Sequence, residues 1–356
     1  MPLVFRYEPK PARVHFGAGR IAVIAAAVSE LGCSRAFIVS TAGQARLAAR
    51  VAAELGNMAA GAFSSAVMHT PVDVTDNAVA AATGAGADCL VAIGGGSTIG
   101  LAKAIALRTD LPQVAIPTTY AGSEMTDILG ETKDGAKTTV RTLKVLPETV
   151  IYDVELTLGL PVSVSSTSGM NAIAHAVEAL YAPDGNPVVS LMAEEGIRRL
   201  AKALPAIKAS PRDVEARTSA QLGAWLCGIC LGSAAMALHH KICHVLGGTF
   251  NLPHAETHTV MLPHTANYNA GSAPEAMGII ARALTAESAV HGLHRLKEEL
   301  VGRLSLADLG MPLGGIDKAA EAASANPYPN PRPIELNAIR GMIAAAYRGA
   351  APGSGD

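Results

Sequence analysis

Short apolar runs alternate with amphipathic stretches over the first 120 residues. One run, Asp88–Ile93, is almost continuously apolar, which is typical of a strand buried on both faces of a parallel sheet. The same pattern predicts further strands at residues 13–16, 35–40, 61–64, 66–68 and 113–117. Periodic segments between them predict helices at residues 21–31, 44–55 and 74–84, and from the glycine turn through Leu107. Strands and helices in alternation at this spacing indicate a doubly wound α/β domain.

After Asp153 the pattern becomes entirely helical. Helices are expected at residues 168–181, 187–203, 213–238, 240–247, 274–286, 290–304, 315–324 and 334–347. We place the boundary near residue 160, around Gly159-Leu160-Pro161. The sequence therefore predicts an α/β domain over residues 1–160 and an all-α domain over residues 161–356.

Composition narrows the possible classes of function. The 28 Lys and Arg residues balance 30 Asp and Glu residues, and no basic stripe is present, so we expect neither nucleic acid nor an anionic membrane as a partner. Residues 218–238 carry no charge and could span a bilayer by length, but their small, weakly apolar side chains favour a buried central helix. Five cysteines, an odd number, and no apolar leader before Phe16 predict a reduced, cytoplasmic protein.

A glycine-rich turn, Gly94-Gly95-Gly96-Ser97, follows the strand at residues 88–93 and opens a helix. Glycines allow the backbone to approach a phosphate, and a helix N-terminus presents free N–H groups to it. The spacing is not GxGxxG, so the usual dinucleotide fingerprint does not apply. The alternative is a turn required only for packing.

A second loop rich in hydroxyl groups, Thr118-Thr119-Tyr120-Ala121-Gly122-Ser123, begins where the strand at residues 113–117 ends. Open α/β sheets bind ligands at the carboxyl ends of their strands. Two such loops within thirty residues favour a nucleotide site over the alternative, a solvated surface turn.

Histidines dominate the helical half. Asn171 and His175 are spaced i, i+4, and so are His240 and His244; His254 follows Pro253. Imidazoles on one helix face can bind a divalent metal or transfer protons, although a single buried histidine is more often structural. A metal site would normally add a carboxylate, and Asn171 is an amide, so the sequence leaves open whether a metal binds. His239 is left open as well, and we interpret His15, His69, His258 and His264 as structural.

Several of these motifs together resemble a known family. The glycine turn, Pro117-Thr118-Thr119, the segment from Ser168 to His175 and the histidine block are similar to the iron-containing (group III) alcohol dehydrogenase superfamily. The resemblance covers nearly the whole chain. It implies a dehydroquinate synthase-like fold with an N-terminal nucleotide-binding α/β domain and a C-terminal helical catalytic domain.

Within that superfamily the chain most resembles the maleylacetate reductases. The similarity lies in the segments 96–103, 117–126 and 238–248 and in Asn326-Pro327-Tyr328. Metal-dependent members carry an acidic residue at the position of Asn171 and histidine ligands at those of His175, His240 and His254. They also usually carry an Asp at the position of Gly100. Both departures imply a reductase that needs no metal.

The resemblance also implies the cofactor site. The candidate cofactor-binding residues are Ser40, Gly95, Gly96, Ser97, Thr98, Thr118, Thr119, Ser123 and Lys137. NAD-preferring relatives hold the adenosine ribose with an acidic residue after the first strand. The turn Ser40-Thr41-Ala42-Gly43-Gln44 has no carboxylate, so we expect either NADH or NADPH to be accepted.

The expected reaction is reduction of the conjugated double bond of 2-maleylacetate to 3-oxoadipate, a step in the degradation of aromatic compounds, in a homodimer. The candidate catalytic residues are Asn171, His175, His240, Lys241, His244 and His254, with His244 or His254 favoured as proton donor. Lys241, and less strongly Arg332, are candidate partners of a dicarboxylate substrate. The alternatives are a metal-dependent alcohol dehydrogenase, a dehydroquinate synthase-like lyase and a non-catalytic binder.

Overall fold

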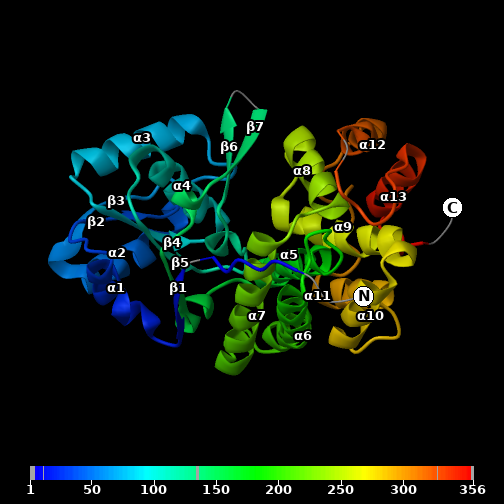
Figure 1. Cartoon of the computed structure of the whole chain (residues 1–356), viewed down its shortest axis with the longest axis horizontal. Coiled ribbons are helices and arrows are strands. Elements are labelled where there is room, and N and C mark those ends of the chain that lie inside the picture. Colours follow the sequence, from blue (N-terminus) through cyan, green and yellow to red (C-terminus); the bar gives the residue numbers. More distant parts are fainter. Residues whose placement is uncertain (1–4, 11, 134–135, 327, 354–356) are drawn as a thin grey trace. The chain divides into compact units, whose positions relative to one another are not determined.

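The computed structural model describes residues 5–10, 12–133, 136–326 and 328–353. The chain divides into two compact units, Pro9–Leu160 and Pro161–Asp356, and the described residues before Pro9 group with the second unit (Figure 1). The first unit is α/β and the second is helical, so the fold class expected from the sequence is confirmed.

A six-stranded parallel sheet forms the centre of the first unit. Its order is β1-β8-β5-β4-β2-β3, and every neighbouring pair runs parallel. The strands are β1 (Arg13–Gly17), β2 (Ala36–Val39), β3 (Ala59–Phe63), β4 (Cys89–Gly94), β5 (Gln113–Pro117) and β8 (Thr149–Asp153). All six residues of β4 are buried, as its apolar run predicts.

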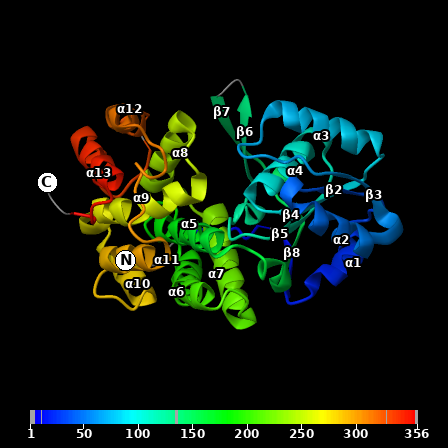
Figure 2. The ribbon, with the colours of Figure 1, turned by 180° about the vertical axis from the view of Figure 1, so that it is seen from behind.

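Helices cover both faces of this sheet (Figures 1 and 2). Helices α1 (Ile24–Glu30) and α2 (Ala45–Leu55) pack on one face, against Ile38, Val91 and Ile93. Helices α3 (Val72–Gly84) and α4 (Gly96–Thr109) pack on the other face, against Phe37 and Leu90. Successive strand residues thus enter different cores, since side chains alternate across a sheet.

The direction of winding changes at β2, which lies between β3 and β4. The chain leaves β2 toward one edge, forms β3, and then returns across β2 to form β4. At such a switch point the turns that follow the two inner strands diverge and leave space for a ligand. The turns concerned are those after Val39 and after Gly94.

One predicted strand of this unit was wrong, and one hairpin was missed. The separate strand expected at residues 66–68 does not form; Ala66 donates its N–H to Ser40 O, and Val67 and Met68 are exposed. An antiparallel hairpin of β6 (Ile128–Lys133) and β7 (Ala136–Arg141) was not predicted. Its strands read ILGETK and AKTTVR and do not alternate between apolar and polar residues, so apolar periodicity does not reveal the hairpin.

The second unit packs helices against one another. They are α5 (Val162–Leu180), α6 (Pro187–Ala209), α7 (Val214–Ser233), α8 (Leu238–Phe250), α9 (His254–Asn269), α10 (Pro274–Ala283), α11 (Ala289–Val301), α12 (Ile316–Ser324) and α13 (Leu336–Arg348). α12 and α13 lie side by side in both views (Figures 1 and 2) and share a core with α8 and α9.

Several helices differ from those expected; α6, for example, continues to Ala209 instead of ending at residue 203. α5 begins at Val162 rather than near Ser168, because its hydroxyl groups donate to carbonyls four residues earlier, as Ser168 does to Val164 O at 2.6 Å, and so remain inside the helix. α9 was missed because it is polar in sequence, carries Pro263 and is buried along most of its length. The helix expected through Leu238 ends at Ser233 instead.

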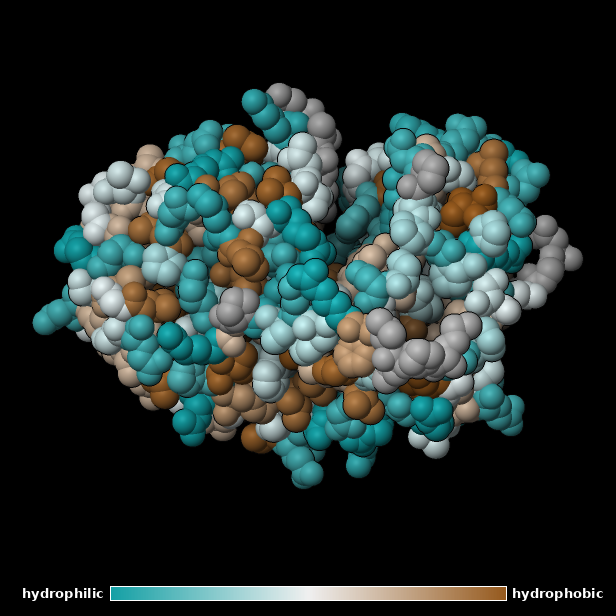
Figure 3. All heavy atoms as spheres, in the orientation of Figure 1, coloured by the Kyte–Doolittle hydropathy of each residue, from teal (hydrophilic) through white to brown (hydrophobic). Residues whose placement is uncertain are grey.

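No single described helix combines the length and apolar character needed to cross a membrane. α7 and α8 reach that threshold only when taken together, and a 94° bend separates them. On the face shown in Figure 3, apolar residues lie in small groups among polar ones.

Candidate active site

The glycine turn after β4 is shaped by close contacts that a side chain would disrupt. A Cβ atom on Gly94, whose φ is +156°, would lie 2.3 Å from Thr98 Oγ1 and 2.4 Å from Gln44 Oε1. A Cβ on Gly95 would lie 3.0 Å from side-chain atoms of Thr119. Gly95 is also the N-cap of α4 and offers no side-chain cap. This bare helix start beside a hydroxyl-lined loop fits a phosphate group.

Gln44 links the turn after β2 to the hydroxyl-rich loop after β5, and it was not singled out from the sequence. Its amide nitrogen donates to Thr118 Oγ1 at 2.8 Å, which links the turn after β2 to the loop after β5. Ser40 is fully buried at the end of β2, and its hydroxyl donates to Ser64 Oγ at 2.9 Å. The Ser40 hydroxyl, a candidate cofactor contact, therefore already has a hydrogen-bond partner within the protein.

Among the other candidate cofactor residues, Thr98 is buried and lies against Gly94, while Ser97 and Thr119 are partly exposed. Lys137 pairs with Thr132 in the β6–β7 hairpin, but its side chain lies outside the described part of the structure. Pro327, part of a motif noted in the sequence, lies outside the described residues as well.

Lys103 holds the loop that contains Ser123. It is fully buried in α4, and its ammonium group donates to Ser123 O at 2.6 Å, Thr126 O at 2.6 Å and Ile128 O at 3.0 Å. The sequence contained a signal for this role, because Lys103 is the single charged residue between Asp88 and Leu107. A buried lysine in an apolar helix usually has a specific set of partners.

The histidines gather as the sequence predicts. The rings of His175 on α5 and His240 on α8 stack with centroids 5.1 Å apart. His244 lies 6.1 Å from His240 and 6.3 Å from His254, again between ring centroids. His175 and His240 are buried, whereas His244 and His254 are exposed. The cluster therefore has a buried end and an exposed end.

Glu178 lies behind this cluster and was missed as a functional residue. It occupies the same face of α5 as Asn171 and His175, and its carboxylate is fully buried. Oε2 accepts hydrogen bonds from His240 Nδ1 at 2.6 Å and from Ala237 N at 3.0 Å, and Oε1 accepts one from His239 N at 2.7 Å. Glu178 is the only charged residue between Val162 and Leu180, which is the signal that could have identified it.

The pKa of Glu178 reflects these donors. Burial alone would raise the pKa of the carboxyl group, but the hydrogen bond from His240 and the electrostatic interaction with it, together with the backbone N–H groups, hold the pKa below its usual value. The start of α8 contributes in the same direction, because a helix N-terminus carries a positive partial charge. Glu178 is therefore a buried carboxylate.

His239 and His258 form a second buried layer. Thr265 Oγ1 donates to Met261 O, so it accepts from His239 Nδ1 at 3.0 Å; His239 Nε2 then accepts from His258 Nδ1 at 2.9 Å. The His258 ring lies 4.9 Å from that of His240 and 4.3 Å from that of His254. His258, which we interpreted as structural, therefore belongs to the cluster.

Four buried polar atoms in the described part of this cluster have no hydrogen-bond partner: Asn171 Oδ1, His175 Nδ1, His240 Nε2 and His258 Nε2. Buried polar groups are normally paired, so a set of such atoms indicates a place where a ligand binds. Burial lowers the pKa of His175 well below its ordinary value, and the neighbouring histidines lower it further. His175 is therefore neutral and offers a lone pair or a single N–H group.

The three histidines expected as metal ligands do not form a preformed metal centre. Within the described residues, groups of three potential ligand atoms that all lie within 4.8 Å of one another occur at His239, Cys243 and His258 and at Cys33, Asp88 and Cys89. His175, His240 and His254 do not form such a group. Asn171 adds only a neutral amide, and the nearest carboxylate, Glu178, is already engaged by N–H donors.

Both candidate substrate cations lie against aromatic rings. Lys241 is partly buried and lies 5.9 Å from the centroid of the Tyr328 ring. Arg332 stacks on Tyr268 at 4.3 Å and pairs with Glu335 at 3.3 Å.

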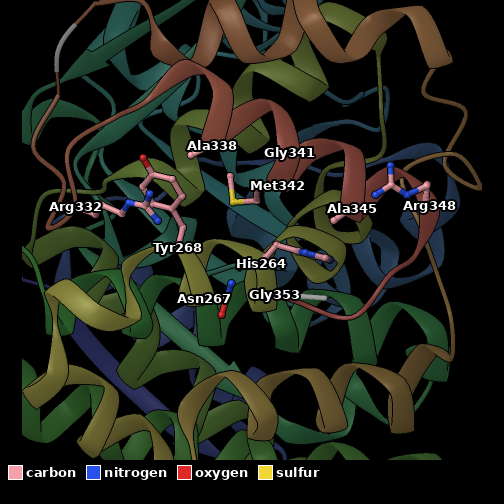
Figure 4. Close-up of a pocket in the computed structure, with 10 residues that line it drawn as sticks. All are labelled: His264, Asn267, Tyr268, Arg332, Ala338, Gly341, Met342, Ala345, Arg348 and Gly353. Atoms are coloured by element: carbon pink, nitrogen blue, oxygen red, sulfur yellow. The ribbon is translucent and has the colours of Figure 1, made fainter. Parts of the chain in front are cut away.

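Arg332 lines a separate pocket of about 310 Å³ between α9 and α13 (Figure 4). The pocket also contains His264, Tyr268, Met342 and Arg348. None of the four histidines expected at the active site lines it. Arg332 therefore belongs to a different part of the helical unit from the one the sequence suggested.

Comparison with known proteins assigns the family. The C-terminal domain of the Fe-containing alcohol dehydrogenase family matches residues 165–347, and the iron-containing alcohol dehydrogenase domain matches residues 11–154. The chain is 57% identical to a maleylacetate reductase of Sphingobium indicum over 98% of this chain and 99% of that protein. It is 55% identical to one of Burkholderia cepacia, with the same coverage of both chains.

Solved structures agree. The crystal structure of a maleylacetate reductase from Rhizobium sp. strain MTP-10005 superposes with a TM-score of 0.94 at 53% identity, covering 99% of this chain and 100% of that one. A putative alcohol dehydrogenase from Ralstonia eutropha JMP134 gives a TM-score of 0.97 at 54% identity, covering 98% and 99%. The resemblance read from the sequence motifs is thus confirmed: the chain belongs to the iron-containing alcohol dehydrogenase family, and it is an oxidoreductase.

Proposed function

We propose that this protein reduces the carbon–carbon double bond of 2-maleylacetate, giving 3-oxoadipate, with NADH or NADPH as the reductant. The observation that carries this proposal is the 46–57% identity to maleylacetate reductases over 98% of the chain. The buried histidine cluster, with four unpaired polar atoms, supports it as a place for a polar substrate.

The chemistry suits such a cluster. A bound reduced nicotinamide would supply the hydride. In a double bond conjugated to a ketone, a new C–H bond at the far alkene carbon displaces the π electrons onto the ketone oxygen as an enolate. A proton delivered to the adjacent carbon then restores the ketone. The protein must therefore stabilise a negatively charged oxygen and supply one proton.

We assign these tasks to different ends of the cluster. His175 and Asn171 would contact the substrate oxygen from the buried end, and His240 would lie beside them. His244 and His254, which are exposed and can exchange protons with water, would deliver the proton. Lys241 remains our candidate for a substrate carboxylate, because its side chain is only partly buried.

The cofactor would bind at the switch point of the α/β unit. Gly95, Gly96, Ser97 and Thr98 would hold the pyrophosphate, and Thr118, Thr119 and Ser123 would line the rest of the site, with Lys137 nearby. The turn from Ser40 to Gln44 has no carboxylate, so it would not repel the 2′-phosphate of NADPH. We propose that both cofactors are accepted.

We further propose that no metal takes part. The support is the donor set: an amide at Asn171 and histidine ligand atoms that do not converge within 4.8 Å. A conjugated ketone also needs a Lewis acid less than a simple aldehyde does, since its negative charge is delocalised. The partners we propose are a small dicarboxylate substrate and a second copy of the chain, in the cytoplasm.

The decisive experiment follows NADH absorbance in the presence of 2-maleylacetate, with and without a chelator. We expect consumption of NADH that the chelator leaves unchanged, and 3-oxoadipate as the product. No net oxidation of NADH would exclude the reductase and favour a lyase or a non-catalytic binder. Light scattering in solution tests the dimer.

A metal-dependent alcohol dehydrogenase is the second candidate. One contact favours it: ligating histidines usually donate their other N–H to a carboxylate, as His240 does to Glu178. Elemental analysis of the pure protein separates the two candidates. Stoichiometric iron or zinc that is required for activity would exclude the metal-free reductase.

A further inference from the structure

Glu178 makes two kinds of contact, one with the backbone at the start of α8 and one with the side chain of His240. It caps the start of α8, because Ala237 offers no side-chain cap of its own and its N–H donates to Glu178 Oε2. It also accepts a hydrogen bond from the ring of His240 at 2.6 Å. The first contact positions the helix, and the second positions one side chain on it.

The ring contact determines which nitrogen of His240 can act on a substrate. A carboxylate can only accept hydrogen bonds, so Nδ1 must carry a proton and donate it to Glu178. Nε2 is left as the second ring nitrogen, and it is one of the four buried atoms without a partner. While Glu178 stays in place, the proton remains on Nδ1 and Nε2 remains the nitrogen that can meet a ligand.

The surroundings keep this arrangement rigid. His240 is buried, its ring stacks on His175, and the ring of His258 lies 4.9 Å away. Rotation of the His240 ring would break the bond to a fully buried carboxylate and leave its charge unpaired on that side. A buried charge that loses a partner is strongly destabilised.

We propose that Glu178 is a positioning residue for the reaction, which fixes the ring orientation and the tautomer of His240 so that Nε2, and not Nδ1, faces the bound substrate. This inference rests on the proposed function for its kinetic consequences, but the Glu178–His240 link itself does not. Glu178 touches no reacting atom in this scheme and acts only through His240.

Two substitutions separate its roles. Glu178→Met keeps the length of the side chain and removes every acceptor. Glu178→Gln keeps one oxygen, which can still accept from His240 Nδ1 while a backbone N–H group loses its partner. We expect Glu178→Met to lower kcat between about 10- and 100-fold with KM changed less, and Glu178→Gln to recover part of that loss.

A double-mutant cycle with His240→Asn tests whether Glu178 acts through His240. The asparagine amide nitrogen can replace Nδ1 but nothing replaces Nε2. In that background we expect Glu178→Met to lower kcat by less than about threefold. An equal loss in both backgrounds would mean that Glu178 only supports the fold, and it would overturn the proposal.

Nitrogen-15 NMR of histidine-labelled protein provides a reading that does not depend on activity. His240, assigned by the loss of its signals in His240→Asn, should show a protonated Nδ1 and an unprotonated Nε2 in the neutral ring. A His240 with its proton on Nε2 would refute the proposal even if the Met variant failed to fold. If the protein did not reduce maleylacetate, the same spectrum would still decide the link between Glu178 and His240.

Discussion

The ammonium nitrogen of Lys103 lies 2.6 Å from the backbone oxygen of Ser123. One residue belongs to the helix that follows the glycine turn, and the other belongs to the loop after the next strand. Lys103 also donates to Thr126 O at 2.6 Å and to Ile128 O at 3.0 Å, so a single buried side chain fixes the path of that loop. Lys103 therefore connects the helix that follows the glycine turn to the loop after β5, and both of these segments belong to the proposed cofactor site.

Replacing Lys103 by Met should loosen this connection. Met fills a similar volume but leaves the carbonyl groups of Ser123, Thr126 and Ile128 without their donor. A buried polar group left unpaired costs about 1–3 kcal/mol, so we expect a loss of several kcal/mol from the free energy of unfolding. Denaturant unfolding measures the loss, and Lys318→Met, at an exposed site, is the control. An unchanged midpoint for Lys103→Met would contradict the role assigned to this lysine.

Gly95→Ala should weaken cofactor binding. The added Cβ would lie 3.0 Å from Thr119, so the loop would have to shift at the site proposed for the pyrophosphate. We expect the Kd of NADH to rise roughly tenfold, which corresponds to about 1.4 kcal/mol. Titration of NADH fluorescence measures it. Gly84→Ala, where a Cβ would meet nothing within 4 Å, serves as the matched control and should bind NADH normally.

Asn171→Asp should give the cluster the affinity for metal that it is proposed to lack. The substitution places a carboxylate one turn before His175, at the position where metal-dependent relatives carry an acidic residue. We expect the variant to bind zinc measurably in calorimetry, and the unchanged protein to bind it at least tenfold more weakly, since a charged ligand attracts a divalent cation more than an amide does. Equal affinities would show that Asn171 does not control metal binding.

Stability should fall in mild acid because of the buried histidines. Burial lowers the pKa of His239 from 6.5 to about 3; the carboxylate of Glu178 opposes this shift, and the neighbouring His240 and His254 reinforce it. The unfolded chain therefore takes up a proton on this residue at a higher pH than the folded one. Neutral His239 therefore contributes fully to the free energy of unfolding above pH 6.5, and this contribution is lost progressively as the pH falls toward 3.

Thermal unfolding between pH 7 and pH 4 checks this dependence. His239→Gln should show a shallower decline than the unchanged protein over that range, while His291→Gln, at an exposed position, should leave the slope as it is. The same slope in all three proteins would mean that the buried histidines do not govern stability in acid.

The sequence by itself determined the fold class, the family and the grouping of the four expected histidines. Apolar runs of strand length predicted the parallel sheet, since a strand buried on both faces must be apolar throughout. The i, i+4 spacing predicted that Asn171 and His175 share one helix face and that His240 and His244 share another, because helical geometry is local. The glycine turn was visible for the same reason.

Only the tertiary structure decided which other residues join them. Glu178 meets His240 across 62 positions, and Gln44 meets Thr118 across 74, so no local pattern connects either pair. His258 lies on a helix whose sequence is too polar to be recognised, and it became part of the cluster only when that helix packed beside α8. Packing also placed Arg332 against Tyr268 instead of the histidines. Local periodicity specifies secondary structure, but the partners of a buried polar group depend on which elements pack together.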